Sequence, residues 1–165
     1  MGIKRIGKHL LLNRWRVRRA FPRQALANIE KAIKASEATH AGQIRFVVEG
    51  ALDGAPLFKD QPARARAIDV FAQLRLWDTL NNNGILIYLL LADRDVEIVA
   101  DRGIDRKVGA AAWQAICAQM ERAFRERRYA DAVVQGVDEV SALLAQHFPH
   151  TAATRNELSD KPFVL

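Results

Sequence analysis

The sequence predicts an α/β fold, a three-layer α/β/α sandwich around a small mixed sheet with a central β-hairpin. Ile85–Leu91 is a run of seven apolar residues, which is typical of a strand buried on both faces and too short to cross a bilayer. After a polar break of hairpin length at 92–95, Val96–Ala100 alternates as a second strand does. Segments with helical periodicity stand on both sides of this hairpin, and they suffice to cover both faces of a sheet.

The other elements follow from local signals. Pro22 begins a helix that runs to about His40, and Gln43–Glu49 is the next strand. A right-handed crossover places this strand parallel to Ile85–Leu91. Further helices are expected from Pro62 to just before Asn82, from about Ala110 to Arg127, and from Tyr129 to Phe148. A short fourth strand has two possible sources, the loop at 50–60 or the C-terminal tail, and periodicity does not choose between them.

Positive charge is concentrated at the N-terminus. Residues 1–23 hold eight of the 25 Lys and Arg residues and no acid, whereas residues 24–165 hold 17 basic and 19 acidic residues. The chain therefore divides into a basic amphipathic helix at 1–21, an α/β domain at 22–149 and an extended tail at 150–165. A nearly neutral body argues against a nucleic-acid-binding face spread over the domain.

The basic arm at 1–21 admits three interpretations. Its apolar residues recur with rough helical spacing, so it can pack on the domain, lie on an anionic membrane surface, or contact nucleic acid. Nucleic acid is not expected as a partner, because no RNP-like or helix-turn-helix pattern is visible. No secretory signal or membrane helix is predicted. The single cysteine fits a protein of the reducing cytoplasm. If the arm binds lipid, we expect the protein at the inner face of the membrane.

Acidic residues follow the predicted strands at both ends of the hairpin. Glu49 and Asp93 are expected at the carboxyl ends of the two parallel strands, where ligands gather in open α/β sheets. Asp101 and Asp105 belong to the opposite end, roughly 20 Å away for a strand of six residues. Either set would suit Ca²⁺ or Mg²⁺, and we favour Asp101 and Asp105 because Gly103 between them permits close backbone approach to a ligand.

A structural interpretation stands beside this metal hypothesis. Asp93 and Asp95 are also good turn formers, and Asp105 can precede or cap a helix. The sequence LADRD at 91–95 superficially matches a phosphatase nucleophile motif, but the chain returns directly into a strand where that fold needs a helix.

Other reactive or aromatic residues are expected to be structural. Cys117 lies on an apolar helical stripe and lacks the spacing to an arginine that a cysteine phosphatase loop requires, so a core thiol is predicted. Trp77 and Trp113 are expected in the core, and the four histidines form no metal-binding pair.

Several segments resemble the TPM domain family, also called TPM-phosphatase or DUF477-type. The similar segments are Glu37–Phe46, Asn83–Tyr88, Ala92–Ile104, the region after Tyr129, and the tail Asn156–Pro162, which is similar to a short bacterial branch without a membrane anchor. The resemblance implies a modified Rossmann-like α/β/α domain and, in some members, a divalent-cation site that is often calcium. It also implies an acid phosphatase activity proposed for plant thylakoid relatives, and an association of bacterial relatives with LemA-type membrane proteins and envelope stress.

Two functional hypotheses follow. The first is an accessory or binding domain, cation-dependent, that docks to a membrane protein or an anionic membrane through the basic arm. The alternative is a metal-assisted phosphatase acting on small phosphomonoesters or phosphoproteins, in which the metal activates water because no protein nucleophile is evident. The sequence departs from the family at DRGID, residues 101–105, where many TPM members carry a Gly-x-Gly-Leu-Glu-like loop.

Overall fold

A computed structural model describes residues 3–11, 14–152 and 154–165, and it confirms the predicted fold class. Four strands form one open mixed sheet in the order β3-β2-β1-β4. β1 (Gln43–Glu49) pairs parallel with β2 (Gly84–Leu90), and β2 pairs antiparallel with β3 (Asp95–Ala100). The predicted crossover and the central hairpin are therefore both present.

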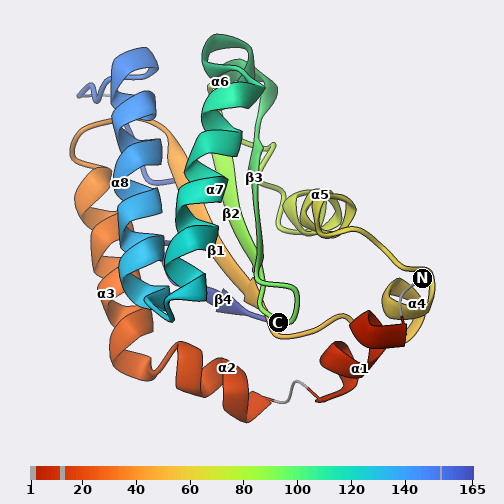
Figure 1. The fold of residues 1–165 in the computed structure, drawn as a ribbon. Coiled ribbons are helices and arrows are strands. Elements are labelled where there is room, and N and C mark those ends of the chain that lie inside the picture. The colour runs from red at the N-terminus through yellow and green to blue at the C-terminus, as the bar shows by residue number, and fades with distance from the viewer. Residues whose placement is uncertain (1–2, 12–13, 153) are drawn as a thin grey trace.

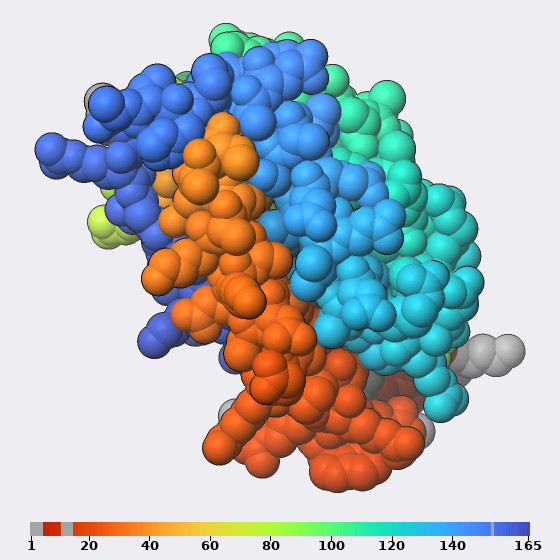
Figure 2. Space-filling view, turned by 90° about the vertical axis from the view of Figure 1, so that its left-hand side faces the viewer, coloured from red at the N-terminus to blue at the C-terminus, as the bar shows by residue number. Residues whose placement is uncertain are grey.

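Helices cover the two faces of the sheet unequally (Figure 1). α3 (Arg23–Ser36), α7 (Ala110–Arg125) and α8 (Tyr129–His147) pack side by side on one face, which Figure 2 shows from outside. α5 (Ala63–Gln73) lies on the other face, and the short helix α4 (Gly54–Phe58) precedes it in the chain. Because both faces are covered, every residue of β2 is buried, as its uninterrupted apolar sequence predicts.

The side chains of the strands divide between two apolar clusters. Ile85, Ile87 and Leu89 face the larger cluster, under the three long helices. Their neighbours Leu86 and Tyr88 face the smaller cluster, under α5. This alternation continues in β3, as predicted, and it decides which face of the sheet each polar side chain reaches.

The structure corrects several boundaries. The predicted single helix at 1–21 is two helices, α1 (Ile3–Leu11) and α2 (Arg14–Ala20), and its residues 1, 2, 12 and 13 lie outside the described part. The loop at 50–59 contains α4, and the expected loop at 101–105 belongs to α6 (Arg102–Val108). The fourth strand comes from the tail: β4 (Phe163–Val164) pairs parallel with β1.

The two predicted core tryptophans differ. Trp113 on α7 is buried, as expected, but Trp77 is 52% exposed. α5 ends at Gln73, so Trp77 leaves the periodic face of the helix on which its burial was predicted. No helix in the described part of the chain is both long and apolar enough to cross a bilayer.

Candidate functional site

The antiparallel register of the hairpin separates the predicted acidic residues into two groups. Asp93 lies in the turn at 91–94, beyond the carboxyl ends of β1 and β2. Asp101 lies at the other end, where its N–H donates to the Gly84 carbonyl at 2.8 Å. The two ends therefore have different surroundings.

Glu49 at the end of β1 belongs to a buried polar triad. Its Oε2 accepts from Arg66 Nε at 2.9 Å and from the Tyr88 hydroxyl at 2.6 Å, and its Oε1 accepts from Arg66 Nη2 at 3.0 Å. Burial raises the pKa of Tyr88, and the hydrogen bond with Glu49 raises it further. The hydrogen bond with Glu49 raises the pKa of Arg66 more than burial lowers it. The carboxylate therefore has its counter-ion within the chain.

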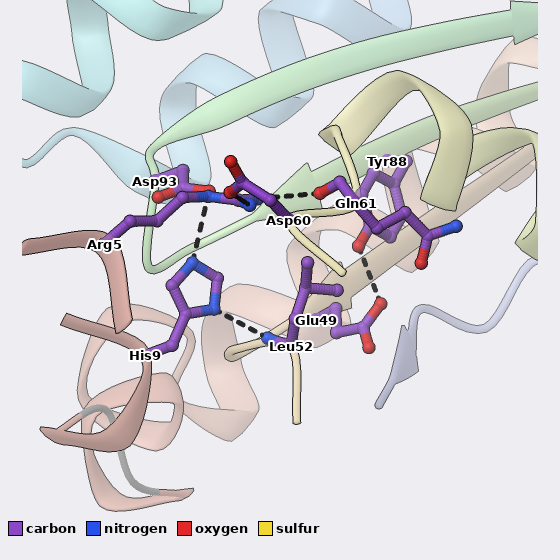
Figure 3. Close-up of polar contacts among 8 residues, drawn as sticks. All are labelled: Arg5, His9, Glu49, Leu52, Asp60, Gln61, Tyr88 and Asp93. Atoms are coloured by element: carbon purple, nitrogen blue, oxygen red, sulfur yellow. Dashed lines mark hydrogen bonds and ion pairs between the residues drawn. The ribbon is translucent and has the colours of Figure 1, made fainter. Parts of the chain in front are cut away.

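Asp93 is paired with side chains of α1 (Figure 3). Arg5 Nε donates to Asp93 Oδ2 at 2.9 Å, and the same guanidinium contacts Asp60 at 2.7 Å and the Gln61 carbonyl at 2.9 Å. His9 Nε2 lies 3.2 Å from the same Asp93 oxygen. A divalent cation at Glu49 and Asp93 would have to displace an arginine from each carboxylate.

A hydrogen bond to the His9 ring assigns its tautomer. Its Nδ1 accepts from the Leu52 N–H at 2.8 Å, so in the neutral ring the proton is on Nε2, which faces Asp93. The ring is buried between α1 and the chain that follows β1. Arg5 and His9 together attach the N-terminal helix to the edge of the sheet where α/β proteins commonly bind ligands.

Asp101 at the opposite end is the N-cap of α6. Its Oδ1 accepts from the Arg102 N–H at 2.7 Å, whereas its buried Oδ2 has no hydrogen-bond partner among the described residues. Asp105 lies one turn later, and its Oδ1 accepts from Trp113 Nε1 at 3.0 Å. DRGID is thus a capped first turn of helix, and this corrects the expectation of an open loop.

Gly103 approaches another segment of backbone. A Cβ at this position would lie 2.4 Å from the Asn82 carbonyl oxygen and 2.7 Å from that of Asn81. The glycine is therefore required where α6 packs on the turn before β2, and its predicted role of accommodating a ligand stays a prediction. Within the described residues no group of three or more His, Cys, Asp or Glu side chains is placed to hold a metal ion.

A third group of polar residues lines a groove beside β3. The groove has a volume of about 500 Å³, and Arg64, Asp95, Glu97, Cys117 and Glu121 are among its lining residues. Burial raises the pKa of Asp95 to about 6, with further contributions from the carboxylates of Glu97 and Glu121. Burial raises the pKa of Cys117 to about 12, so the thiol is protonated at neutral pH and is a poor nucleophile.

This geometry can be compared with known proteins. The family model described as "TPM domain" matches residues 18–143, which is most of the chain. The chain belongs to the TPM domain family. The match begins within α2 and ends within α8, so α1, with Arg5 and His9, lies outside the matched TPM domain.

Two solved structures are similar to this TPM domain. The BA42 protein from the psychrophilic bacterium Bizionia argentinensis, solved by NMR, has 25% identity and a TM-score of 0.76, covering 86% of this chain and 93% of BA42. The N-terminal domain of a P. gingivalis protein has 24% identity and a TM-score of 0.57, covering 73% of this chain and 76% of that one, and it supports the fold alone. No curated protein matches this chain.

Proposed function

We propose that this TPM domain is an accessory or binding module that attaches, from the cytoplasm, to an anionic membrane surface or to a membrane protein of the LemA type through α1 and α2. The observation that carries the proposal is the exposed face of these two helices. Trp15 is 60% exposed and Leu10 70% exposed, and both stand among cations. Among the side chains of α1 and α2 whose burial is described, the exposed cations are Lys8, Arg16, Arg18 and Arg19.

Exposed aromatic and basic side chains are the two components of an interfacial helix. Tryptophan prefers the headgroup level of a bilayer, and each Lys or Arg near an anionic surface contributes about 1 kcal/mol of attraction. The Arg19 guanidinium lies 5.4 Å from the Trp15 ring centroid, so aromatic and cationic groups share one surface. In Figure 2 residues of α2 form the lower end of the molecule, beyond the long helices.

Vesicle sedimentation tests this attachment. The full chain is expected to sediment with vesicles of phosphatidylcholine containing about 30% phosphatidylglycerol, and 0.5 M NaCl is expected to release it, because the Debye length shortens. Arg18→Glu/Arg19→Glu should abolish binding, and Trp15→Ala should weaken it. Arg106→Glu/Arg122→Glu reverses two exposed charges elsewhere on the domain and serves as the matched control. Equal binding by the two double variants would contradict the use of the arm.

The second candidate function is the binding of a divalent cation at Asp101. The metal-assisted phosphatase would use this same cation site. Buried carboxylate oxygens are normally hydrogen-bonded or ligated, and Asp101 Oδ2 has no partner among the described side chains and backbone groups. Asn83 Oδ1, on the strand end next to Asp101, is likewise buried and unpartnered there. Asp101 therefore fits the role of a hard-cation ligand, with Asp105 as the predicted second carboxylate. Bound there, a divalent cation would supply the Lewis acid that lowers the pKa of a water molecule.

Calcium titration followed by NMR, with phosphate release from p-nitrophenyl phosphate measured in parallel, separates these possibilities. Saturable shifts at the amides of residues 81–84 and 101–105 that Asp101→Asn removes would support the cation site. Shifts that persist in that variant would exclude Asp101 as a ligand. Phosphate release that is independent of metal and unchanged by Asp101→Asn would end the phosphatase hypothesis.

A further inference from the structure

The outer edge of β3 is a sheet edge with which no strand of the described chain pairs. β3 is the terminal strand in the order β3-β2-β1-β4. Because the Asp101 N–H bonds to β2, the alternation of an antiparallel ladder directs the main-chain groups of Val96, Ile98 and Ala100 outward. Such a row of donors and acceptors is a template for another extended chain.

Side chains from the two flanking helices meet these outward groups. Arg64 from α5 donates from Nη1 to the Ile98 carbonyl. From α7, Glu121 accepts from the Val96 N–H at 3.4 Å, and Cys117 forms a hydrogen bond with the Ile98 backbone. Val96 and Ile98 are each 2% exposed, so a partner segment reaches their main-chain groups only when covering side chains move aside. The bond from Val96 to Glu121 is long at 3.4 Å, and the Arg64 side chain is 51% exposed, so these are the two contacts that the segment displaces.

The groove along this edge is acidic in a protein that is basic as a whole. Its carboxylates come from Asp95, Glu97, Asp105 and Glu121, and Arg64 is the cation among its lining residues. Arg125, outside the lining, lies 3.9 Å from Glu121, so four acids stand near two cations. The whole chain carries a formal net charge of +6. Burial and neighbouring carboxylates raise the pKa values of Asp95 and Glu97, as expected where acidic groups outnumber cations.

We propose that the outer edge of β3 binds an extended, basic segment of a partner protein by β-strand addition. The segment donates a main-chain N–H to the Ile98 carbonyl in place of Arg64, and one of its carbonyls accepts from the Val96 N–H in place of Glu121. Lysine or arginine side chains of the segment then pair with the carboxylates of the groove. A segment of about six residues matches the length of β3, and the main-chain bonds provide affinity while the charges provide selectivity.

The basic arm of this chain is a poorer occupant than a partner segment. Its residues 3–11 and 14–20 are helical, whereas strand addition requires an extended backbone. Arg5 within it is bonded to Asp93 and Asp60 at the hairpin turn. A second copy of the chain is the other possible occupant, and the light-scattering measurement below distinguishes it from a partner protein.

The experiment uses the full chain and three labelled hexapeptides measured by fluorescence anisotropy. One alternates lysine with valine, the second alternates glutamate with valine, and the third is the lysine peptide with N-methyl groups on alternate amides, which keeps its charge but removes strand hydrogen bonds. Only the first is expected to bind. Binding of the N-methylated peptide with equal affinity would overturn the proposal, because charge alone would then explain the attraction.

Variants of the groove make the test specific. Glu97→Lys and Glu121→Lys should each weaken binding about tenfold, because like charges then face each other. Arg64→Ala should strengthen binding about two- to tenfold, since it exposes the Ile98 carbonyl without the cost of immobilising a displaced side chain. Glu126→Lys reverses an exposed charge outside the groove and should change little.

Two further readouts complete the test on the wild-type protein. NMR shifts from the lysine peptide should centre on the amides of Val96 and Ile98, and shifts confined to other strands would overturn the proposal. Light scattering without peptide reports self-association. A dimer that Glu97→Lys dissociates would make a second copy the occupant and would likewise overturn it. Neither result depends on whether the arm binds membranes.

Discussion

The buried triad of Glu49, Arg66 and Tyr88 supports a quantitative prediction. Arg66→Met removes the only guanidinium bonded to Glu49 among the described residues and leaves a carboxylate that is almost fully buried. Breaking a buried ion pair from one side costs about 3–5 kcal/mol, because an uncompensated charge remains. For a chain of this length each kcal/mol lowers the melting temperature by about 2–4 °C, so a fall of roughly 6–20 °C is expected.

Two companion variants test the reason for this loss. Tyr88→Phe removes one hydrogen bond to a charged acceptor but leaves the guanidinium in place, so its cost should be about 1.5 kcal/mol. The triple variant Glu49→Leu/Arg66→Met/Tyr88→Phe removes every polar partner and should be more stable than Arg66→Met alone, because no unpaired charge stays buried.

Urea unfolding followed by circular dichroism measures these free energies of unfolding. Arg106→Met replaces an exposed arginine on α6 and should change the free energy of unfolding by less than about 0.5 kcal/mol. A loss below about 1 kcal/mol for Arg66→Met, or a triple variant less stable than that single variant, would refute the interpretation of Glu49 as an internally neutralised carboxylate.

Three other predictions concern pH and packing. The pKa of Asp95 is raised from 3.8 to about 6, so the folded state binds its proton more tightly, and stability is lost as pH rises through this interval. In thermal melts at pH 7, Asp95→Asn should be more stable than wild type by about 1 kcal/mol, after discounting for partial exposure. At about pH 3.5 the two proteins should be equally stable. Gly103→Ala should destabilise the protein by about 1–3 kcal/mol in urea unfolding, whereas Gly7→Ala, where an added Cβ meets nothing within 4 Å, should not. Burial and the hydrogen-bonded neighbour Asp160 raise the pKa of Glu37 from 4.5 to about 7, so stability is lost as pH rises through this interval. Amide exchange in the tail, corrected for its intrinsic rate, should increase between about pH 5 and 7 in wild type but not in Glu37→Gln.

Periodicity predicted the parts of the fold that depend on burial. The apolar run of β2 and the alternation of β3 fix which residues face each cluster, and the register follows from that pattern. The short elements α4 and α6 were missed, because five to seven residues provide too little periodicity to distinguish a helix from a loop. The fourth strand is a pairing of two residues with β1, and such a pairing depends on tertiary contact rather than on local pattern.

The partners of the carboxylates were harder to predict than the carboxylates themselves. Tyr88 gave one usable signal, because a buried tyrosine in an aliphatic strand requires an acceptor, and Glu49 ends the neighbouring strand. Arg66 and Arg5 gave none, since exposed and paired arginines look alike in a sequence. The pairing of Arg5 with Asp93 spans 88 residues, and only the folded chain brings the two together.

The N-terminal arm neutralises acidic residues at one edge of the sheet. Acidic residues do gather at the carboxyl ends of the parallel strands, but Arg5 and His9 occupy the position that a bound cation would take there. The carboxylates of Asp95, Glu97, Asp105 and Glu121 lie instead along β3, where Arg64 is the cation among the lining residues and Arg125 lies 3.9 Å from Glu121. Since partly buried carboxylates that outnumber the nearby cations favour cationic ligands, the edge of β3 is where we expect a basic partner segment to bind.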